Sequence, residues 1–206
     1  MFPYLSVKDS FQFPDPREAD PPGIVASGGN LSPGMLVSAY RQGIFPWFSE
    51  EDPILWWSPD PRFVLYPQRL HVSKSMRRVL KRGVFTITFD TAFDHVISEC
   101  ADKERPGQDG TWITRDMRDA YSVLHRLGIA HSAEAWQEGR LVGGLYGLSL
   151  GKIFFGESMF AHCTNASKAA FIVLVQSLAS RGVRLIDCQV YTHHLSSCLL
   201  YTSPSP

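Results

Sequence analysis

The feature that most limits how this chain can fold is a segment rich in both tryptophan and proline, residues 44–62, which reads IFPWFSEEDPILWWSPDPR. Three of the five tryptophans of the chain lie in it, at Trp47, Trp56 and Trp57. Proline has no backbone N–H and a fixed φ, so the segment cannot be helical, and we expect its prolines to break any central strand. We therefore predict an ordered, extended loop. Its rings either cover the core of a small domain or form a stacking surface for planar groups such as bases.

Composition places the chain among ordinary soluble globular proteins. It has 206 residues, of which 44% are hydrophobic and 19% charged, enough for one large domain or two small ones. The four cysteines show no C-x-x-C spacing, which indicates neither a zinc site nor a disulfide framework. The sequence contains no apolar run of about 18 residues and no secretory signal at its start. We expect a cytoplasmic protein without a metal.

Charge is unevenly distributed although the formal net charge is zero. Residues 1–60 carry three basic and eight acidic side chains, whereas residues 61–89 carry seven basic and no acidic ones. Five of the seven lie on a predicted helix over 73–82: Lys74, Arg77, Arg78, Lys81 and Arg82. Such a cluster is either a solvated helix face or a binding surface for a polyanion, and its density favours the polyanion.

Periodicity predicts an α+β protein. Helices are expected from Pro33 to Gly43 and over 73–82, 91–101 and 114–127, and strands over 84–89, 130–137 and 140–150, the last two joined by a tight turn at Glu138-Gly139. A further strand over 153–160, an apolar helix from about Asn165 to Gly182 and a final strand over 183–190 complete a β-β-β-α-β order. That order is typical of N-acyltransferases of the GNAT type. Residues 1–30 are expected to be mostly irregular.

Three polar side chains are out of place in apolar strands. In LIDCQV, strand alternation places Asp187 and Gln189 on one face and Cys188 on the other. A carboxylate and a carboxamide there are costly to bury without hydrogen bonds, so they either orient an amine or tie down a loop. In FFGESMF, Glu157 either holds a polar group of a ligand or simply points to solvent. A nucleophilic role for Cys188 is disfavoured because a lone buried cysteine usually serves packing.

Several long motifs together resemble one family. GIFPWF, DPILWWSPDPR, GTWITR, LVGGLYG, FFGESMF, NASK and LIDCQV are similar to segments of leucyl/phenylalanyl-tRNA–protein transferases, from about Phe13 to Ser197. The resemblance implies a cofactor-free enzyme that moves leucine, phenylalanine or, less well, methionine from aminoacyl-tRNA to an N-terminal Arg or Lys, which marks the acceptor for the N-degron pathway. It also implies a small N-terminal domain over 1–70 and a GNAT-like catalytic domain over 71–197. We expect a monomer without membrane contact.

The resemblance also assigns roles to residues. Asp187 and Gln189 would orient and activate the incoming α-amine, and Glu157 would hold the aminoacyl group or ribose beside them. Trp47 and Trp112 would flank the terminal adenosine, and the basic helix would contact phosphates of the acceptor stem. The side-chain pocket would be lined by Leu145, Phe154, Met159, Phe171 and Ile186.

Two other functions use parts of the same pattern. A GNAT acyltransferase that uses acyl-CoA would share the fold, but the segment AHCTNASK lacks the glycines of a pyrophosphate loop. An RNA-binding module without activity would need the basic cluster and the tryptophans but not Asp187, Gln189 and Glu157. After Ser197 the chain departs from the family pattern, so we expect residues 198–206 to be a non-native or truncated tail.

Overall fold

The N-terminal part of the protein is a small sheet covered by one helix. The computed structural model describes residues 2–19, 21–103 and 111–191. A 3-10 turn η1 (Pro16–Glu18) precedes strands β1 (Ile24–Ser27), β2 (Phe45–Pro46) and β3 (Leu55–Trp57), which pair antiparallel in the order β1-β3-β2. Helix α1 (Pro33–Arg41) begins at the expected proline, and Ser32 before it accepts a hydrogen bond from the backbone N–H of Leu5. The expectation that residues 1–30 are mostly irregular misses β1.

The expectation that prolines break any central strand in residues 44–62 is wrong. β3 is the central strand of this sheet, and it fits because its three residues lie between Pro53 and Pro59. Pro46 lies in β2, an edge strand, where a missing N–H costs no ladder bond. Trp56 is 1% exposed and its indole N–H donates to the carbonyl of Gly28 at 2.8 Å. The ring is therefore part of the core.

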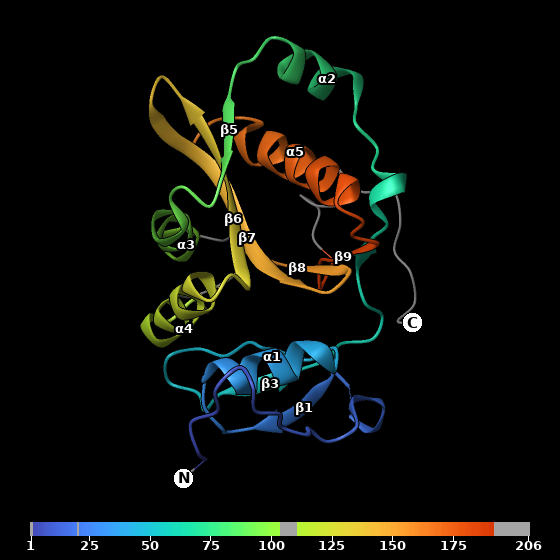
Figure 1. Ribbon diagram of the computed structural model, residues 1–206, viewed down its shortest axis with the longest axis vertical. Helices are drawn as coiled ribbons and strands as arrows, with labels where there is room; N and C mark the ends of the chain where they lie inside the picture. The colour runs from blue at the N-terminus through green and yellow to red at the C-terminus, as the bar shows by residue number, and fades with distance from the viewer. Residues whose placement is uncertain (1, 20, 104–110, 192–206) are drawn as a thin grey trace.

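The larger part is a six-stranded mixed sheet in the order β4-β9-β8-β7-β6-β5 (Figure 1). Strands β5 (Thr86–Phe89), β6 (Ala130–Gln137), β7 (Arg140–Leu150) and β8 (Ile153–Ala161) form an antiparallel meander, and β9 (Leu185–Asp187) pairs parallel with β8 after helix α5 (Ala166–Ser180). The predicted hairpin turn is confirmed, with positive φ at Glu138 and Gly139. The expected β-β-β-α-β order is present as β6, β7, β8, α5 and β9.

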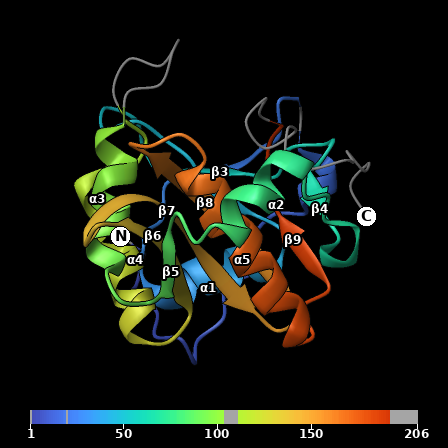
Figure 2. The ribbon, with the colours of Figure 1, turned by 90° about the horizontal axis from the view of Figure 1, so that it is seen from above.

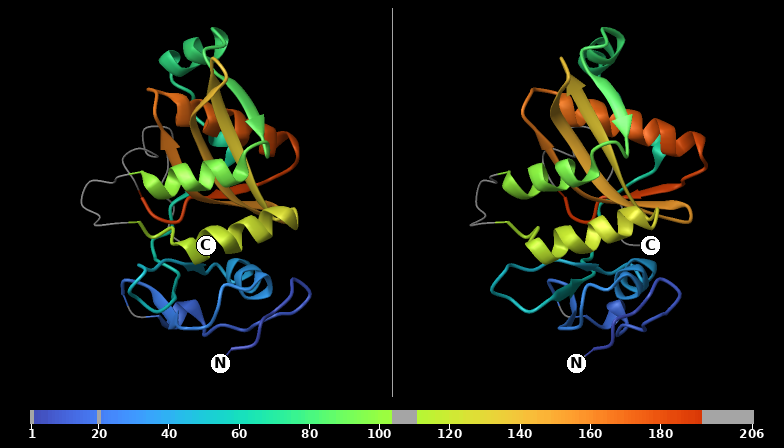
Figure 3. Two further views of the ribbon diagram at one scale, coloured as in Figure 1. Left: turned by 90° about the vertical axis from the view of Figure 1, so that its left-hand side faces the viewer. Right: turned by 60° about the vertical axis from the view of Figure 1, so that its left-hand side comes forward.

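Helices cover both faces of this sheet. Helices α2 (Lys74–Lys81) and α5 lie on one face, and α3 (Phe93–Asp102) and α4 (Arg115–Arg126) on the other, as the view from above shows (Figure 2). Ser73 and Thr114, where the predicted helices begin, cap α2 and α4, because each side chain accepts a hydrogen bond from the N–H three residues on. The N-terminal layer packs below α4 (Figure 3).

Two apolar clusters hold the layers together. The first runs from α1 and Trp56 through α3 and α4 to β7 and β8, so the N-terminal layer and the sheet share one continuous core. The second lies between the sheet and α5. The structure is thus a mixed α+β protein with a small N-terminal domain.

The connection between the two parts crosses into the larger sheet early. β4 (Val64–Leu65) pairs antiparallel with β9, and the 3-10 turn η2 (Pro67–Arg69) follows it. A domain boundary near residue 70 stays a prediction. The expected tail, 198–206, lies outside the described residues. Where the structure describes helices, none offers the long apolar stretch that a bilayer span requires.

Trp56 provides a test of this core. We expect Trp56→Phe to lower the free energy of unfolding by about 2–3 kcal/mol, because it leaves a cavity and an unpaired carbonyl at Gly28. Urea denaturation followed by circular dichroism measures the loss. The matched control is Tyr4→Phe, whose side chain is 73% exposed and whose effect should stay within about 0.5 kcal/mol. Equal stability of Trp56→Phe and the wild type would contradict the assignment.

Candidate active site

The three polar side chains singled out from the sequence meet at one place, where the parallel strands β8 and β9 part. Strand pairing runs from Ile153–Leu185 to Phe155–Asp187 and ends there. Beyond it, the Gln189 side-chain N–H donates to the Glu157 carboxylate at 2.7 Å, and the Gln189 backbone N–H donates to Asp187 at 2.9 Å. All three side chains are buried, with 6–8% of each residue exposed. The sequence thus identified a real polar cluster.

The reason given for that cluster was wrong in one respect. β9 ends at Asp187, so alternation along a strand does not extend to Gln189. Gln189 has a φ of 62°, in the left-handed region, and the Asp187 carboxylate caps its backbone N–H two residues on, as in an Asx turn. Gln189 reaches Glu157 through this turn. Cys188 lies in the second apolar cluster with Ile186, and burial raises the pKa of its thiol, which makes it a poor nucleophile.

Glu157 owes its position to a β-bulge. Tyr146 of β7 pairs with Ser158 and Gly147 with Gly156, so Glu157 is the extra residue in β8. Gly147 is needed beside the bulge, since a Cβ built there would lie 2.1 Å from the carbonyl oxygen of Phe155. The bulge presents the Glu157 carboxylate to helix α4.

Two tyrosines, Tyr40 of α1 and Tyr121 of α4, complete the surroundings of Glu157. The Tyr121 hydroxyl donates to the Glu157 carboxylate at 3.2 Å, and the hydroxyls of Tyr40 and Tyr121 are in hydrogen-bond contact. Both tyrosines are at most 1% exposed. A buried tyrosine needs a partner for its hydroxyl, so two tyrosines on apolar helix faces were a weak signal of a buried polar group.

This environment changes the proton affinity of Glu157. Burial raises the pKa of Glu157 from 4.5 to about 7, against the lowering effect of the Tyr40 and Tyr121 hydroxyls; the negative charge of Asp187 raises it further, and the positive charge of Arg62 lowers it. Burial likewise raises the pKa values of Tyr40 and Tyr121 well above 10.0, with the Glu157 charge as the next cause. Glu157 can therefore gain or lose a proton near neutral pH, whereas the two tyrosines stay protonated.

Asp187 is fully engaged. Arg62 donates to it from Nε at 2.9 and 3.1 Å and from one terminal nitrogen at 2.9 Å, and the Gln189 N–H takes a further acceptor position. A carboxylate offers about four acceptor positions, so little capacity remains for a substrate. Arg62 is 5% exposed, which removes it from the surface cluster of positive charge in which the sequence had placed it.

The five predicted pocket residues lie together. Leu145, Phe154, Phe171 and Ile186 are buried members of the second apolar cluster, and Met159 packs against it half-buried. Leu145 pairs with Met159 across β7 and β8, and Phe154 pairs with Ile186 across β8 and β9. Phe171 comes from α5. The cluster therefore borders the point where the two parallel strands separate.

Both tryptophans predicted to flank an adenosine are half-buried at the edge of the first cluster. The Trp47 ring lies 5.3 Å from the ring of Trp57, whose indole N–H donates to the Trp47 carbonyl at 2.6 Å. Trp57 thus contacts Trp47 through both its ring and its indole N–H. Trp112 stands two residues before Thr114, the residue that caps α4.

The basic residues of α2 face solvent. All five predicted residues are exposed, and α2 is attached to α5 through Met76, which packs on Ala169 and Ile172. Arg77 also donates from Nε to the carbonyl of Val72 at 2.9 Å.

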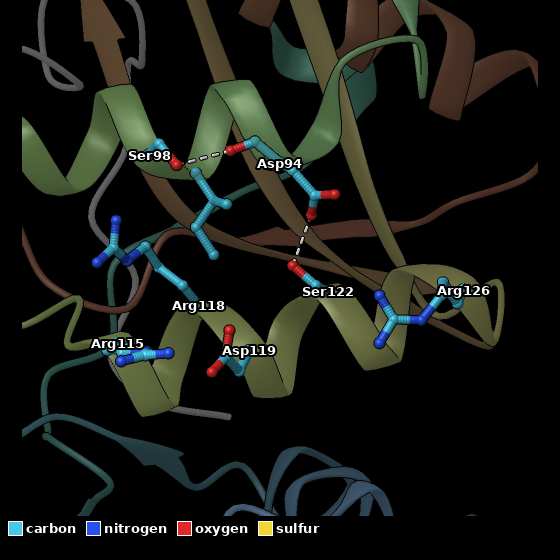
Figure 4. A pocket seen from close by; sticks show the side chains of 8 residues that line it. Asp94, Ser98, Arg115, Arg118, Asp119, Ser122 and Arg126 are labelled. Carbon is cyan, nitrogen blue, oxygen red and sulfur yellow. Dashed lines mark hydrogen bonds between the residues drawn. The ribbon is translucent and has the colours of Figure 1, made fainter.

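A separate cavity of about 420 Å³ lies between α3 and α4, lined by alternating charges (Figure 4). It contains none of the predicted site residues. Its polar lining is Asp94, Ser98, Arg115, Arg118, Asp119, Ser122 and Arg126. Within the described ranges, no group of three or more His, Cys, Asp or Glu side chains is arranged to hold a metal ion.

Known proteins match both parts of the chain. A family model described as leucyl/phenylalanyl-tRNA protein transferase matches residues 64–204, and one described as the N-terminal domain of the same proteins matches residues 29–60. These matches place the chain among transferases. The chain belongs to the leucyl/phenylalanyl-tRNA protein transferase family.

Curated relatives agree with this assignment. A protein named leucyl/phenylalanyl-tRNA--protein transferase from Anaeromyxobacter sp. (strain K) is 60% identical over 183 residues, 89% of this chain and 78% of that protein. Its namesake from Stutzerimonas stutzeri (strain A1501) is 54% identical over 192 residues, 92% of this chain and 84% of that protein. Among solved structures, L-PGS from Bacillus licheniformis aligns with a TM-score of 0.44 and 13% identity over 65% of this chain and 48% of that chain, too low to support an argument.

The raised pKa of Glu157 predicts how stability depends on pH. Because the folded-state pKa, about 7, exceeds the ordinary 4.5, Glu157 stabilises the fold fully below about pH 4.5, and this contribution is lost as pH rises through 7. At about 1.4 kcal/mol per pKa unit, the loss is on the order of 3 kcal/mol. Glu157→Gln should remove that part of the decline between pH 5 and 8 in urea denaturation.

The control for this measurement is Glu51→Gln, an exposed glutamate in the loop between β2 and β3. It should leave the pH dependence unchanged. A wild-type decline that persists in full in Glu157→Gln would show that Glu157 does not titrate in this range.

Proposed function

We propose that the protein transfers leucine or phenylalanine, and less well methionine, from aminoacyl-tRNA to the N-terminal Arg or Lys of an acceptor protein, marking it for the N-degron pathway. One observation carries the proposal: the buried Glu157–Gln189 pair borders the apolar cluster of Leu145, Met159 and Phe171. Such a site holds polar reacting groups beside an apolar side chain. Family membership supports the same donor and acceptor classes.

The reaction makes modest chemical demands. The acceptor's α-amine attacks the carbonyl carbon of the aminoacyl ester, the new C–N bond forms, and the ester C–O bond to the ribose breaks. The amine loses a proton, and the released ribose hydroxyl gains one. Since the ester is already activated, orienting the two reactants supplies much of the acceleration, and a proton acceptor adds roughly 10²- to 10⁴-fold.

The roles of the polar residues follow from their partners. Glu157 and the Gln189 carboxamide contact the reacting groups, because they retain hydrogen-bonding capacity and Glu157 can accept a proton near pH 7. Asp187, saturated by Arg62 and the Gln189 backbone, orients the amine through Gln189 and does not bind it directly. The family resemblance implied that Asp187 itself orients and activates the amine; our proposal leaves Asp187 only the indirect role through Gln189.

The apolar cluster selects the donor side chain. Leu145, Phe154, Met159, Phe171 and Ile186 accept an unbranched or γ-branched apolar group, and β-branching near the ester carbonyl would clash with the sheet. One methylene is worth only about 1–3 kcal/mol in such a pocket, which accounts for methionine as a weaker donor. Trp47 and Trp112 flank the terminal adenosine.

Helix α2 holds the tRNA by its phosphates. Lys74, Arg77, Arg78, Lys81 and Arg82 are exposed, and cations on one short helix bind backbone phosphates without reading sequence. Binding of tRNA is therefore salt-dependent.

The catalytic part is GNAT-like in our proposal, because an antiparallel meander leads through α5 to a parallel strand that parts from its neighbour at the site. The acyl-CoA reaction is disfavoured because the turn from β8 into α5 contains no glycine to cradle a pyrophosphate. We propose a cytoplasmic monomer that uses no cofactor.

Direct transfer tests the proposal. Leucyl-tRNA is mixed with a peptide that begins with Arg, and mass spectrometry should show the peptide extended by one leucine. A peptide that begins with Ala is the acceptor control. Binding of leucyl-tRNA without product would favour an RNA-binding module, and modification from acyl-CoA would favour the other enzyme class.

The tRNA surface gives a separate prediction. Arg77→Glu with Arg78→Glu should raise the KM for leucyl-tRNA at least tenfold and leave kcat within about twofold, because phosphate contacts position the substrate without touching the reacting atoms. Steady-state kinetics at two salt concentrations measure both. The charge-matched control is Lys152→Glu with Arg184→Glu, two exposed residues away from α2, which should behave like the wild type. An unchanged KM in the α2 variant would contradict the assignment.

A further inference from the structure

Arg62 is a buried charge that the proposed reaction does not itself require. It is the last residue of the proline-rich segment and precedes β4, and its guanidinium reaches Asp187 at the end of β9. It also lies 4.8 Å from the ring centroid of Phe45 in the N-terminal layer. A buried arginine with a two-sided contact to one carboxylate constrains that carboxylate in position and in orientation.

We propose that Arg62 is a positioning residue for the transfer reaction: it holds the Asp187 carboxylate so that the turn after β9 directs the Gln189 carboxamide onto Glu157. This inference rests on the proposed function, since it describes how the same site is held ready.

Side-chain and main-chain contacts act together on this turn. Arg62 fixes Asp187, and Asp187 accepts the Gln189 N–H at 2.9 Å. The neighbour of Arg62, Phe63, accepts the Cys188 N–H at 2.9 Å and donates to the Gln189 carbonyl at 3.1 Å. Gln189 has a positive φ, which a residue with a side chain adopts at a cost and keeps only when its surroundings hold it. The contacts of Arg62 and Phe63 keep the Gln189 backbone in this conformation.

Arg62 also controls charge around Glu157. Besides the Gln189 carboxamide, the titratable and charged groups that act on Glu157 are Tyr40 from α1, Tyr121 from α4, Asp187 from β9 and Arg62 itself. Of these, Asp187 raises the pKa of Glu157 and Arg62 lowers it. Without Arg62, the Asp187 charge would be uncompensated beside a second buried carboxyl group, and Glu157 would hold its proton to higher pH.

A purely structural role is the alternative to be tested. Arg62 joins the segment after the N-terminal layer to the sheet, so its loss would lower stability in either case. The two roles differ in the pH dependence of kcat, because a residue that only links two segments of the fold would not shift the ionisation of Glu157.

The test compares four variants with the wild type in leucine transfer to the Arg peptide. Arg62→Met removes the charge, Arg62→Lys keeps it without the two-sided contact, and Arg62→Met with Asp187→Asn removes both charges of the pair. Arg41→Met, an exposed arginine in the last turn of α1, is the matched control. For each, kcat and KM are measured from pH 5.5 to 9, with thermal melting in parallel.

We expect Arg62→Met to lower kcat at least tenfold with little change in either KM, and to move the acidic limb of the kcat profile upward by about one pH unit. Arg62→Lys should keep the wild-type pH midpoint but lower kcat, because lysine cannot orient the carboxylate. The neutral pair should return the midpoint to the wild-type value while kcat remains low. Arg41→Met should match the wild type.

An unchanged pH midpoint in Arg62→Met, with loss of stability alone, would overturn the inference. If that variant does not fold, wild-type kcat in Arg62→Lys or in the neutral pair would overturn it equally. Absence of transfer by the wild type would overturn the proposed function and this inference with it, so the two failures are distinguishable.

Discussion

A buried ion pair at the end of the parallel pairing of β8 with β9 underlies the arrangement of the site. Burying Arg62 and Asp187 costs desolvation energy, and that cost is offset only by close geometry and by satisfying the remaining acceptor positions. Three hydrogen bonds from the guanidinium and one from the Gln189 backbone do so. Because the pair joins the segment after the N-terminal layer to β9, the small domain and the sheet take up their relative positions together with the site.

The site combines two environments that the sheet keeps apart. One face of the sheet carries the first apolar cluster, which is bordered by the hydroxyl groups of Tyr40 and Tyr121 and the carboxyl group of Glu157. The other face carries the second apolar cluster, which lies under α5. The bulge at Glu157 and the early end of β9 open the sheet between them. Polar reacting groups and an apolar side-chain pocket can therefore meet at one point, which is what the transfer of an apolar amino acid between two polar partners requires.

Local signals predicted much of the fold. Capping residues such as Ser73 and Thr114 predicted helix starts, and the Glu138-Gly139 turn predicted the hairpin, because these depend on a few neighbouring residues. Two errors arose where longer-range pairing decides. β3 is a central strand despite its flanking prolines because three residues suffice to pair with both neighbours. β9 ends at Asp187, where its pairing with β8 stops and the backbone turns through a positive φ at Gln189.

By itself, the sequence determined which residue types are available for chemistry: a carboxamide and two carboxyl groups in apolar strands, apolar residues for a pocket, and a basic helix. Their proximity was indicated because the spacing in LIDCQV is local and the motifs resemble one family. Only the tertiary structure decided the charge, the hydrogen-bond partners and the pKa of these groups. Arg62 looks like one more surface cation in the sequence, and Tyr40 and Tyr121 look like helix packing. Charge, hydrogen bonding and pKa depend on which groups face one another across 125 residues of chain, as Arg62 and Asp187 do, and no local pattern records that distance.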